Sequence, residues 1–152
     1  IKLQVDDFVK EKPSLKPPES VEIARRIAEA GFDAIEISGG IYESGEELDP
    51  WYLKISTTDE EAYFLPYARK IKEVIGETLL ILVGGIRSFE VAERIVRDGY
   101  ADFISMSRPF IMELDLPQKW LNKLSGKSTC TSCNRCDTEM GNKGLRCLLL
   151  EN

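Results

Sequence analysis

Two short segments carry residue types that can hold an anion. The sequences Val83-Gly84-Gly85-Ile86-Arg87-Ser88 and Ser105-Met106-Ser107-Arg108-Pro109 each follow an apolar run and precede residues that can open a helix. Glycine lets a backbone approach a ligand closely, a helix start offers unpaired N–H groups, and arginine adds a fork of donors. We therefore predict two neighbouring anion-binding corners, formed by Gly84, Gly85, Arg87, Ser107 and Arg108. For either arginine the alternative is an ion pair with a nearby carboxylate.

A second group of reactive side chains lies near the end of the chain. The four cysteines follow the spacing C-x2-C-x2-C-x10-C and are Cys130, Cys133, Cys136 and Cys147. Because no signal peptide opens the chain, clustered thiols favour a soft metal over disulfides. Free or disulfide-linked thiols remain the alternative to a metal site.

The elements between these motifs predict an α/β fold. Short strands that are apolar on both faces are expected near residues 1–5, 33–37, 79–83 and 102–106, as in a parallel sheet covered by helices. Segments 31–38 and 99–106 share one pattern, in which glycine closes a helix, an aromatic residue follows and a strand begins near aspartate. This order of helix, stop and strand is typical of β/α units.

Three helices are expected between the strands. They are residues 20–30 with Ser20 as N-cap, a helix that ends at Gly76 and starts or bends near Pro66, and residues 88–98. Apolar spacing assigns their inward faces to Val21, Ala24, Ile27 and Ala28; to Phe64, Ala68, Ile71 and Ile75; and to Phe89, Ala92, Ile95 and Val96. The long loop 38–58 is either functional or a solvated excursion pinned by Trp51.

Length and composition limit the interpretation further. The 152 residues, 43% hydrophobic and 30% charged, can form one compact domain. A complete (β/α)8 barrel typically takes about 250 residues, so four β/α units predict half of such a barrel. The chain opens at Ile1 within an expected strand, which we interpret as a truncation. We expect a half-barrel over residues 1–125 and a cysteine-rich tail over 126–152.

Charge and hydropathy argue against two classes of partner. A net charge of −6 disfavours a nucleic-acid surface, which needs a basic face. No apolar run reaches the roughly 18 residues of a membrane span, and no signal peptide is visible. We therefore expect a cytoplasmic protein without nucleic-acid or membrane partners.

At this point the motifs resemble a family, the old yellow enzymes or NADH:flavin oxidoreductases, which are FMN-containing (β/α)8 barrels. The resemblance runs from Ile1 to about Cys147 and covers the second half of the barrel. Residues 31–40 look like its sixth-strand segment, 84–88 like its seventh-strand phosphate loop, and 107–109 like its eighth-strand motif. Phosphate-binding barrels of amino-acid biosynthesis share the glycine pair, but the Ser-Arg-Pro step and the cysteine tail favour the flavin family.

The resemblance implies roles for named residues. Gly84, Gly85 and Arg87 would hold the FMN phosphate from one side, and Ser107 and Arg108 from the other. Lys2 would lie near the flavin pyrimidine edge and stabilise negative charge on the reduced ring, the alternative being a solvated lysine. The chain has no histidine, whereas the family binds its substrate carbonyl through a histidine pair or a histidine and asparagine. Those residues and the tyrosine proton donor would lie upstream, so we assign no catalytic residue here.

For the cysteines, relatives of the dienoyl-CoA reductase type imply a 4Fe–4S cluster. They carry four cysteine ligands at this place, with slightly longer spacings after the second and third. The resemblance thus makes Cys130, Cys133, Cys136 and Cys147 candidate ligands. Zinc or another structural metal, and thiols without a metal, stay open.

The function expected from the sequence is that of a carboxy-terminal part of an FMN-dependent NAD(P)H oxidoreductase. Hydride would pass from NAD(P)H through FMN to an activated, enone-like alkene, and this part alone would be inactive. Its partners would be the missing amino-terminal half-barrel or a second copy paired through open sheet edges. The alternatives are a self-standing phosphate-binding β/α module and a structural unit that mediates assembly.

Overall fold

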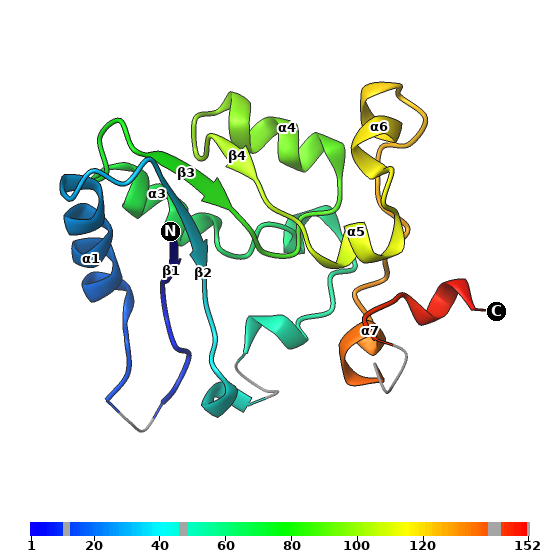
Figure 1. Cartoon of the computed structure of the whole chain (residues 1–152), viewed down its shortest axis with the longest axis horizontal. Coiled ribbons are helices and arrows are strands. Elements are labelled where there is room, and N and C mark those ends of the chain that lie inside the picture. Colours follow the sequence, from blue (N-terminus) through cyan, green and yellow to red (C-terminus); the bar gives the residue numbers. More distant parts are fainter. Residues whose placement is uncertain (11–12, 46–48, 140–143, 152) are drawn as a thin grey trace.

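Four parallel strands form one sheet in the order β1-β2-β3-β4 (Figure 1). The computed structural model describes residues 1–10, 13–45, 49–139 and 144–151. The strands are β1 (Lys2–Gln4), β2 (Ala34–Ser38), β3 (Leu79–Leu82) and β4 (Phe103–Ile104). In the parallel register Leu3 lies opposite Ile37, Ile35 opposite Leu80, and Leu82 opposite Ile104. The predicted order of four parallel β/α units is confirmed, although β1, β3 and β4 are shorter than predicted and β2 is shifted by one residue.

Helices follow each strand and continue beyond the sheet. The α-helices are α1 (Pro17–Glu29), α3 (Leu65–Lys72), α4 (Phe89–Arg97), α5 (Arg108–Met112), α6 (Leu116–Leu121) and α7 (Arg135–Thr138). Single 3-10 turns occur at Tyr42–Ser44, Pro50–Tyr52, Thr58–Glu60 and Leu148–Leu150. Figure 1 shows α7 and the carboxyl end at the opposite side of the molecule from α1. Within the described residues no helix is both long and apolar enough to cross a membrane.

The hydrophobic core lies between one face of the sheet and helices α1, α3 and α4. Alternate strand residues point into it, and they are Leu3, Val5, Ile35, Ile37, Leu80 and Leu82. The helices contribute Ala24, Ala68, Ile71, Val91, Ala92 and Ile95. Because side chains alternate along a strand, this packing leaves the opposite face of the sheet without a helical cover among the described residues.

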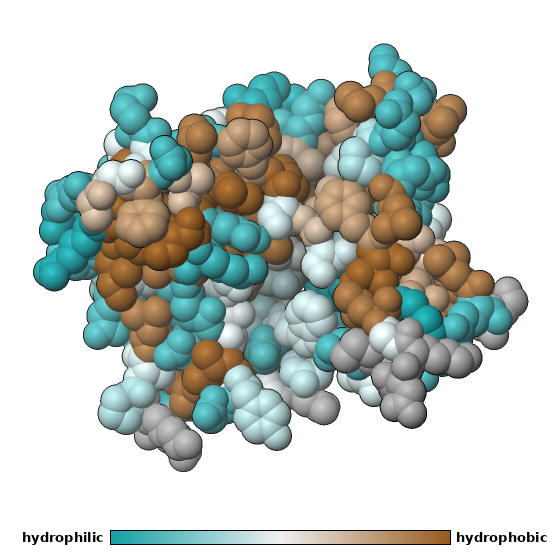
Figure 2. All heavy atoms as spheres, viewed as in Figure 1, coloured by the Kyte–Doolittle hydropathy of each residue, from teal (hydrophilic) through white to brown (hydrophobic). Residues whose placement is uncertain are grey.

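That opposite face corrects the expectation that helices cover both sides. Leu79 is 39% exposed and Phe103 is 54% exposed, although both lie on apolar strands. Figure 2 shows hydrophobic side chains gathered over the strands in this view. This face is apolar on β3 and β4 but carries Lys2 and Glu36 on β1 and β2. It has no helical partner within the described chain, as expected for strands whose other side would line the interior of a closed barrel.

The helix predictions are partly confirmed. The predicted inward residues Phe64, Ala68, Ile71 and Ile75 are all buried, but α3 ends at Lys72 and not at Gly76, so Phe64 and Ile75 flank the helix. The start of α1 is Pro17 and not Ser20, because proline suits the first turn and the Glu19 carboxylate accepts the N–H of Lys16 at 3.1 Å. Ser20 is buried inside the helix, where its hydroxyl donates to the Pro17 carbonyl.

In α4 the predicted inward face is half wrong. Ala92 and Ile95 are buried as predicted, but Val91 takes the place expected for Phe89 and Val96, which are 39% and 43% exposed. The Phe89 ring packs edge-to-face against Trp120 of α6, with 5.7 Å between ring centroids. A partner from beyond the helix therefore turns this aromatic side chain away from the core.

The buried carboxylate of Glu113 fastens the segment after α6 to the rest of the chain. Its side chain is 9% exposed. It accepts hydrogen bonds from the Thr129 N–H at 2.6 Å, the Ser128 hydroxyl at 2.8 Å and the Lys119 ammonium at 3.1 Å. Burial raises the pKa of Glu113, but these hydrogen bonds outweigh burial and hold the pKa at about 2, below the usual 4.5.

We expect Glu113 to make stability depend on acid pH. Because the pKa is lower in the folded state, its contribution is complete above pH 4.5 and is lost as the pH falls towards 2. Glu113→Gln should lower the free energy of unfolding at pH 7 by about 1–3 kcal/mol and flatten its dependence on pH below 4.5. Urea unfolding at several pH values measures both. Glu93→Gln, at an exposed position of α4, is the control, and equal curves for the two variants would contradict this role.

Candidate functional site

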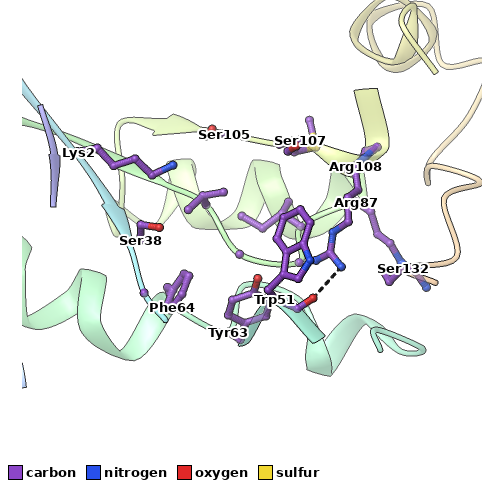
Figure 3. A pocket seen from close by; sticks show the side chains of 17 residues that line it. Lys2, Ser38, Trp51, Tyr63, Phe64, Arg87, Ser105, Ser107, Arg108 and Ser132 are labelled. Atoms are coloured by element: carbon purple, nitrogen blue, oxygen red, sulfur yellow. Dashed lines mark hydrogen bonds between the residues drawn. The ribbon is translucent and has the colours of Figure 1, made fainter. Parts of the chain in front are cut away.

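A cavity of about 220 Å³ opens where the four strands end (Figure 3). In parallel sheets, ligands bind beyond the carboxyl ends of the strands. The cavity is lined by Ser38 and Gly39 after β2, by residues 83–87 after β3 and by residues 105–109 after β4, together with Lys2, Trp51, Tyr63, Phe64 and Ser132. All six residues predicted to bind a cofactor, Lys2, Gly84, Gly85, Arg87, Ser107 and Arg108, lie on this one cavity.

A buried carboxylate that sequence reasoning missed holds the corner after β3. Glu61, 6% exposed, accepts the N–H groups of Arg87 at 3.0 Å and Ser88 at 2.9 Å. It also accepts the Ser88 hydroxyl at 2.6 Å. These N–H groups at the start of α4 are thus already paired inside the protein. No local spacing could have revealed Glu61, which lies 26 positions before Arg87.

The glycine pair at this corner is required by packing as well as by backbone conformation. Gly84 and Gly85 have φ of +123° and +69°. A Cβ on Gly84 would lie 2.8 Å from the Phe64 ring, and a Cβ on Gly85 would lie 2.9 Å from the Tyr63 ring. The glycine pair was expected only to let the backbone approach a ligand closely. In the structure, the absence of a side chain at these two positions allows the rings of Phe64 and Tyr63 to pack directly against the backbone.

Arg87 is buried without a carboxylate partner. Arg87 is 7% exposed, and its Nη1 donates to the Cys130 carbonyl at 2.6 Å. The Nε atom is buried and has no hydrogen-bond partner. Within the described parts of the chain no carboxylate oxygen lies within 4 Å of its guanidinium, so the ion pair considered as an alternative is absent there. Glu60 attracts Arg87 only at longer range, and a buried cation without a directly paired anion is costly unless one joins it.

Arg108, at the corner after β4, is also a buried arginine. It is 7% exposed and its Nη1 donates to the Trp51 carbonyl at 3.2 Å, the bond drawn in Figure 3. The same nitrogen donates to the side-chain oxygen of Asn134. Its guanidinium carbon lies 4.8 Å from the centre of the Trp51 ring, a cation–π contact. Among the described residues this arginine also lacks an ion pair with a carboxylate, and the loop 38–58 is pinned to the cavity through Trp51.

Backbone donors accompany the two arginines. Among the described residues, the N–H groups of Gly85, Ser107 and Arg108 donate to no protein acceptor. Tyr63 adds a hydroxyl, and burial raises its pKa above the usual 10 more than the nearby Arg108 lowers it, so the hydroxyl can donate a hydrogen bond at neutral pH. The wall at this end therefore offers donors and positive charge and is suited to an oxyanion.

Lys2 lies at the other end of the cavity from the two arginines (Figure 3). Its side chain is 56% exposed, and its ammonium lies 3.5 Å from the Glu36 carboxylate. A weak, solvated ion pair of this kind leaves the ammonium able to turn towards a ligand. The cavity thus carries one positive charge at one end and two at the other.

The four cysteines line a second, smaller cavity of about 20 Å³ next to Arg108. All four thiols are free in this structure. Hydrogen bonding by the Arg135 N–H lowers the pKa of Cys133, whereas burial raises the pKa of Cys130 and of Cys136. No three metal-ligating side chains among the described residues approach closely enough to hold a single ion. The thiols share one wall without forming a zinc-type site.

Comparison with known proteins gives a consistent set of relatives. The chain is 34% identical over 134 residues to an NADH oxidase of Thermoanaerobacter brockii, which covers 88% of this chain and 19% of the relative. It is 35% identical over 108 residues to the NADH-dependent flavin oxidoreductase iccE of Talaromyces variabilis, covering 64% of this chain and 24% of that protein. No family model matches the chain. The chain therefore spans only 19% to 24% of the length of these relatives.

A solved structure extends the comparison to the fold. A 2-naphthoyl-CoA reductase in complex with 2-naphthoyl-CoA superimposes with a TM-score of 0.72 and 25% identity. The match covers 89% of this chain and 20% of the reductase. Because that reductase is a TIM barrel, the four parallel β/α units described here have the architecture of a half-barrel.

We expect Gly85→Ala to be much more damaging than Gly99→Ala. The two glycines have similar φ, +69° and +74°, so either alanine should cost about 1–2 kcal/mol of backbone strain. Only at Gly85 does the new methyl meet the Tyr63 ring and Ile55, whereas nothing lies within 4 Å at Gly99. Overpacking should add about 1–3 kcal/mol to the destabilisation by Gly85→Ala. Urea unfolding measures the difference, and equal losses would contradict this account of the cavity floor.

Proposed function

The chain belongs to the NADH:flavin oxidoreductase family, which includes the old yellow enzymes, and we propose that the cavity at the strand ends binds the phosphate end of FMN. The observation that carries this proposal is the pair of buried arginines, Arg87 and Arg108, that face one cavity without carboxylate partners among the described residues. A phosphate dianion would supply the missing negative charge. It would also accept hydrogen bonds from the unpaired N–H groups of Gly85, Ser107 and Arg108.

The size of the cavity supports a site for part of a larger ligand. Pockets for whole cofactors usually measure about 300–1,000 Å³, and this cavity measures about 220 Å³. A phosphate and the chain attached to it suit this space at the arginine end. The orphaned Nε of Arg87 and the glycine backbone fit an oxyanion in particular.

Lys2 is proposed to act on the flavin ring from the far end of the cavity. When bound, flavin accepts hydride from NAD(P)H and passes it to an acceptor, for which we propose an activated alkene. The ammonium of Lys2 would favour the state in which negative charge has built up on the ring. Its loose pairing with Glu36 at 3.5 Å leaves it available for this role.

We propose that the chain works as part of a larger barrel and is inactive alone. Support comes from the apolar sheet face exposed at Leu79 and Phe103, and from relatives four to five times longer than the matched region. Further β/α units would cover that face, and a second copy of this chain is the other candidate. A boundary near residue 125 and a cytoplasmic location belong to the same proposal.

For the cysteines we propose a 4Fe–4S cluster. A cluster holds four thiolates on separate irons, farther apart than four ligands on one zinc ion. Thiols that share a small cavity but form no single-ion group agree better with the cluster than with zinc. Iron, sulfide and zinc analysis of anaerobically purified protein, with its absorption spectrum, decides between them. Iron and sulfide in equal amounts are expected, and zinc alone would refute the cluster.

Fluorescence titration with FMN and riboflavin tests the phosphate site. We expect the chain to bind FMN more tightly than riboflavin, which lacks the phosphate, and to show no turnover of NADH with an enone. Arg108→Ala should weaken FMN binding about tenfold to a hundredfold, because charged hydrogen bonds are lost, and leave riboflavin unchanged. Arg94→Ala, an exposed arginine of α4, is the control.

Two outcomes would refute the proposal. Equal affinity for the two flavins would remove the phosphate site. Inorganic phosphate that binds as tightly as FMN would favour the self-standing phosphate module. Light scattering on the same sample distinguishes a dimer from a monomer, and a monodisperse monomer would exclude the second copy as the cover of the sheet.

A further inference from the structure

Asn134 joins the cysteine segment to the anion-binding end of the strand-end cavity. It lies between Cys133 and Cys136, is 7% exposed and adopts the left-handed conformation at φ +60°. Its Nδ2 donates to the Trp51 carbonyl at 2.9 Å, and its Oδ1 accepts from Nη1 of Arg108. Both ends of this buried amide are therefore used, one on the loop before α3 and one on the arginine.

The other arginine is held by the same segment. Nη1 of Arg87 donates to the Cys130 carbonyl at 2.6 Å. Each guanidinium thus rests on a neutral oxygen that belongs to residues 130–134. A guanidinium has five N–H donors, so this support uses only part of its capacity and leaves further donors for a ligand.

The neutrality of these supporting oxygens matters for binding. An amide or carbonyl oxygen fixes the direction of a guanidinium but does not cancel its charge. A carboxylate at the same place would form an ion pair with Arg108 and compete with an incoming anion. Asparagine also tolerates the left-handed backbone that this turn requires.

We propose that Asn134 is a positioning residue that orients Arg108 towards an anion in the cavity without neutralising it. The inference rests on the proposed phosphate site and names a residue outside the strand-end motifs as a determinant of its affinity. It predicts that a change at Asn134 acts on the phosphate of a ligand and not on the rest of it.

Two substitutions separate the amide from the turn that carries it. Asn134→Gly removes the side chain and keeps the left-handed backbone accessible, whereas Asn134→Asp keeps the shape and adds a negative charge. We expect Asn134→Gly to weaken FMN binding about tenfold and Asn134→Asp to weaken it more, with riboflavin affinity unchanged for both. Asp137→Asn, an exposed neighbour on α7 that lines neither cavity, should bind both flavins like the unaltered chain.

A double-mutant cycle tests whether Asn134 acts through Arg108. In the Arg108→Ala background, Asn134→Gly should cause no further loss of FMN affinity, because the guanidinium that it orients is gone. An additional tenfold loss in that background would overturn the positioning role. A parallel loss of FMN and riboflavin affinity in Asn134→Gly would also overturn it, because it would indicate a general structural defect.

The outcomes keep this inference apart from the proposed function. If the unaltered chain shows no preference for FMN over riboflavin, the phosphate site fails and the inference fails with it. If the preference is present and both Asn134 variants retain it, the phosphate site stands and the inference alone is refuted. If the preference falls in both variants, and falls further in Asn134→Asp, the inference is supported.

Discussion

A buried guanidinium without a carboxylate partner in the described part of the chain is the constraint on which the candidate site depends. Arg108 is supported from two sides by neutral oxygens, the carbonyl of Trp51 and the amide of Asn134. These residues come from a loop before α3 and from the cysteine tail, far from each other in the sequence. Bringing three distant segments around one positive charge costs conformational entropy and the hydration of the guanidinium. The arrangement is understandable if an anion completes it.

Local patterns predicted the framework well because their physical causes are local. Apolar runs, closing glycines and the proline near the start of α3 located four strands and the buried face of α3. The glycine and arginine motifs located the cavity, because the carboxyl ends of parallel strands meet at one edge of a sheet. Residues at strand ends therefore come together whatever the details of packing between them.

The contacts that fix the site could not be predicted in the same way. Glu61 pairs with backbone groups 26 and 27 positions away, and Asn134 pairs with Trp51 across 83 positions. No periodicity connects such residues, because their proximity arises only once the sheet and tail have packed. The prediction of the inward face of α4 was half wrong for a related reason, because Phe89 packs against Trp120 on a later helix.

Arg108 also forms part of the wall of two cavities, the one at the strand ends and the small one bordered by the thiols. Any occupant of the thiol cavity and any occupant of the strand-end cavity would therefore act on one shared cation. Thermodynamic reciprocity requires that, if one occupant changes the affinity of the other by some factor, the second changes the first by the same factor. A change of charge beside the cysteines would therefore change the affinity of the strand-end cavity for its ligand.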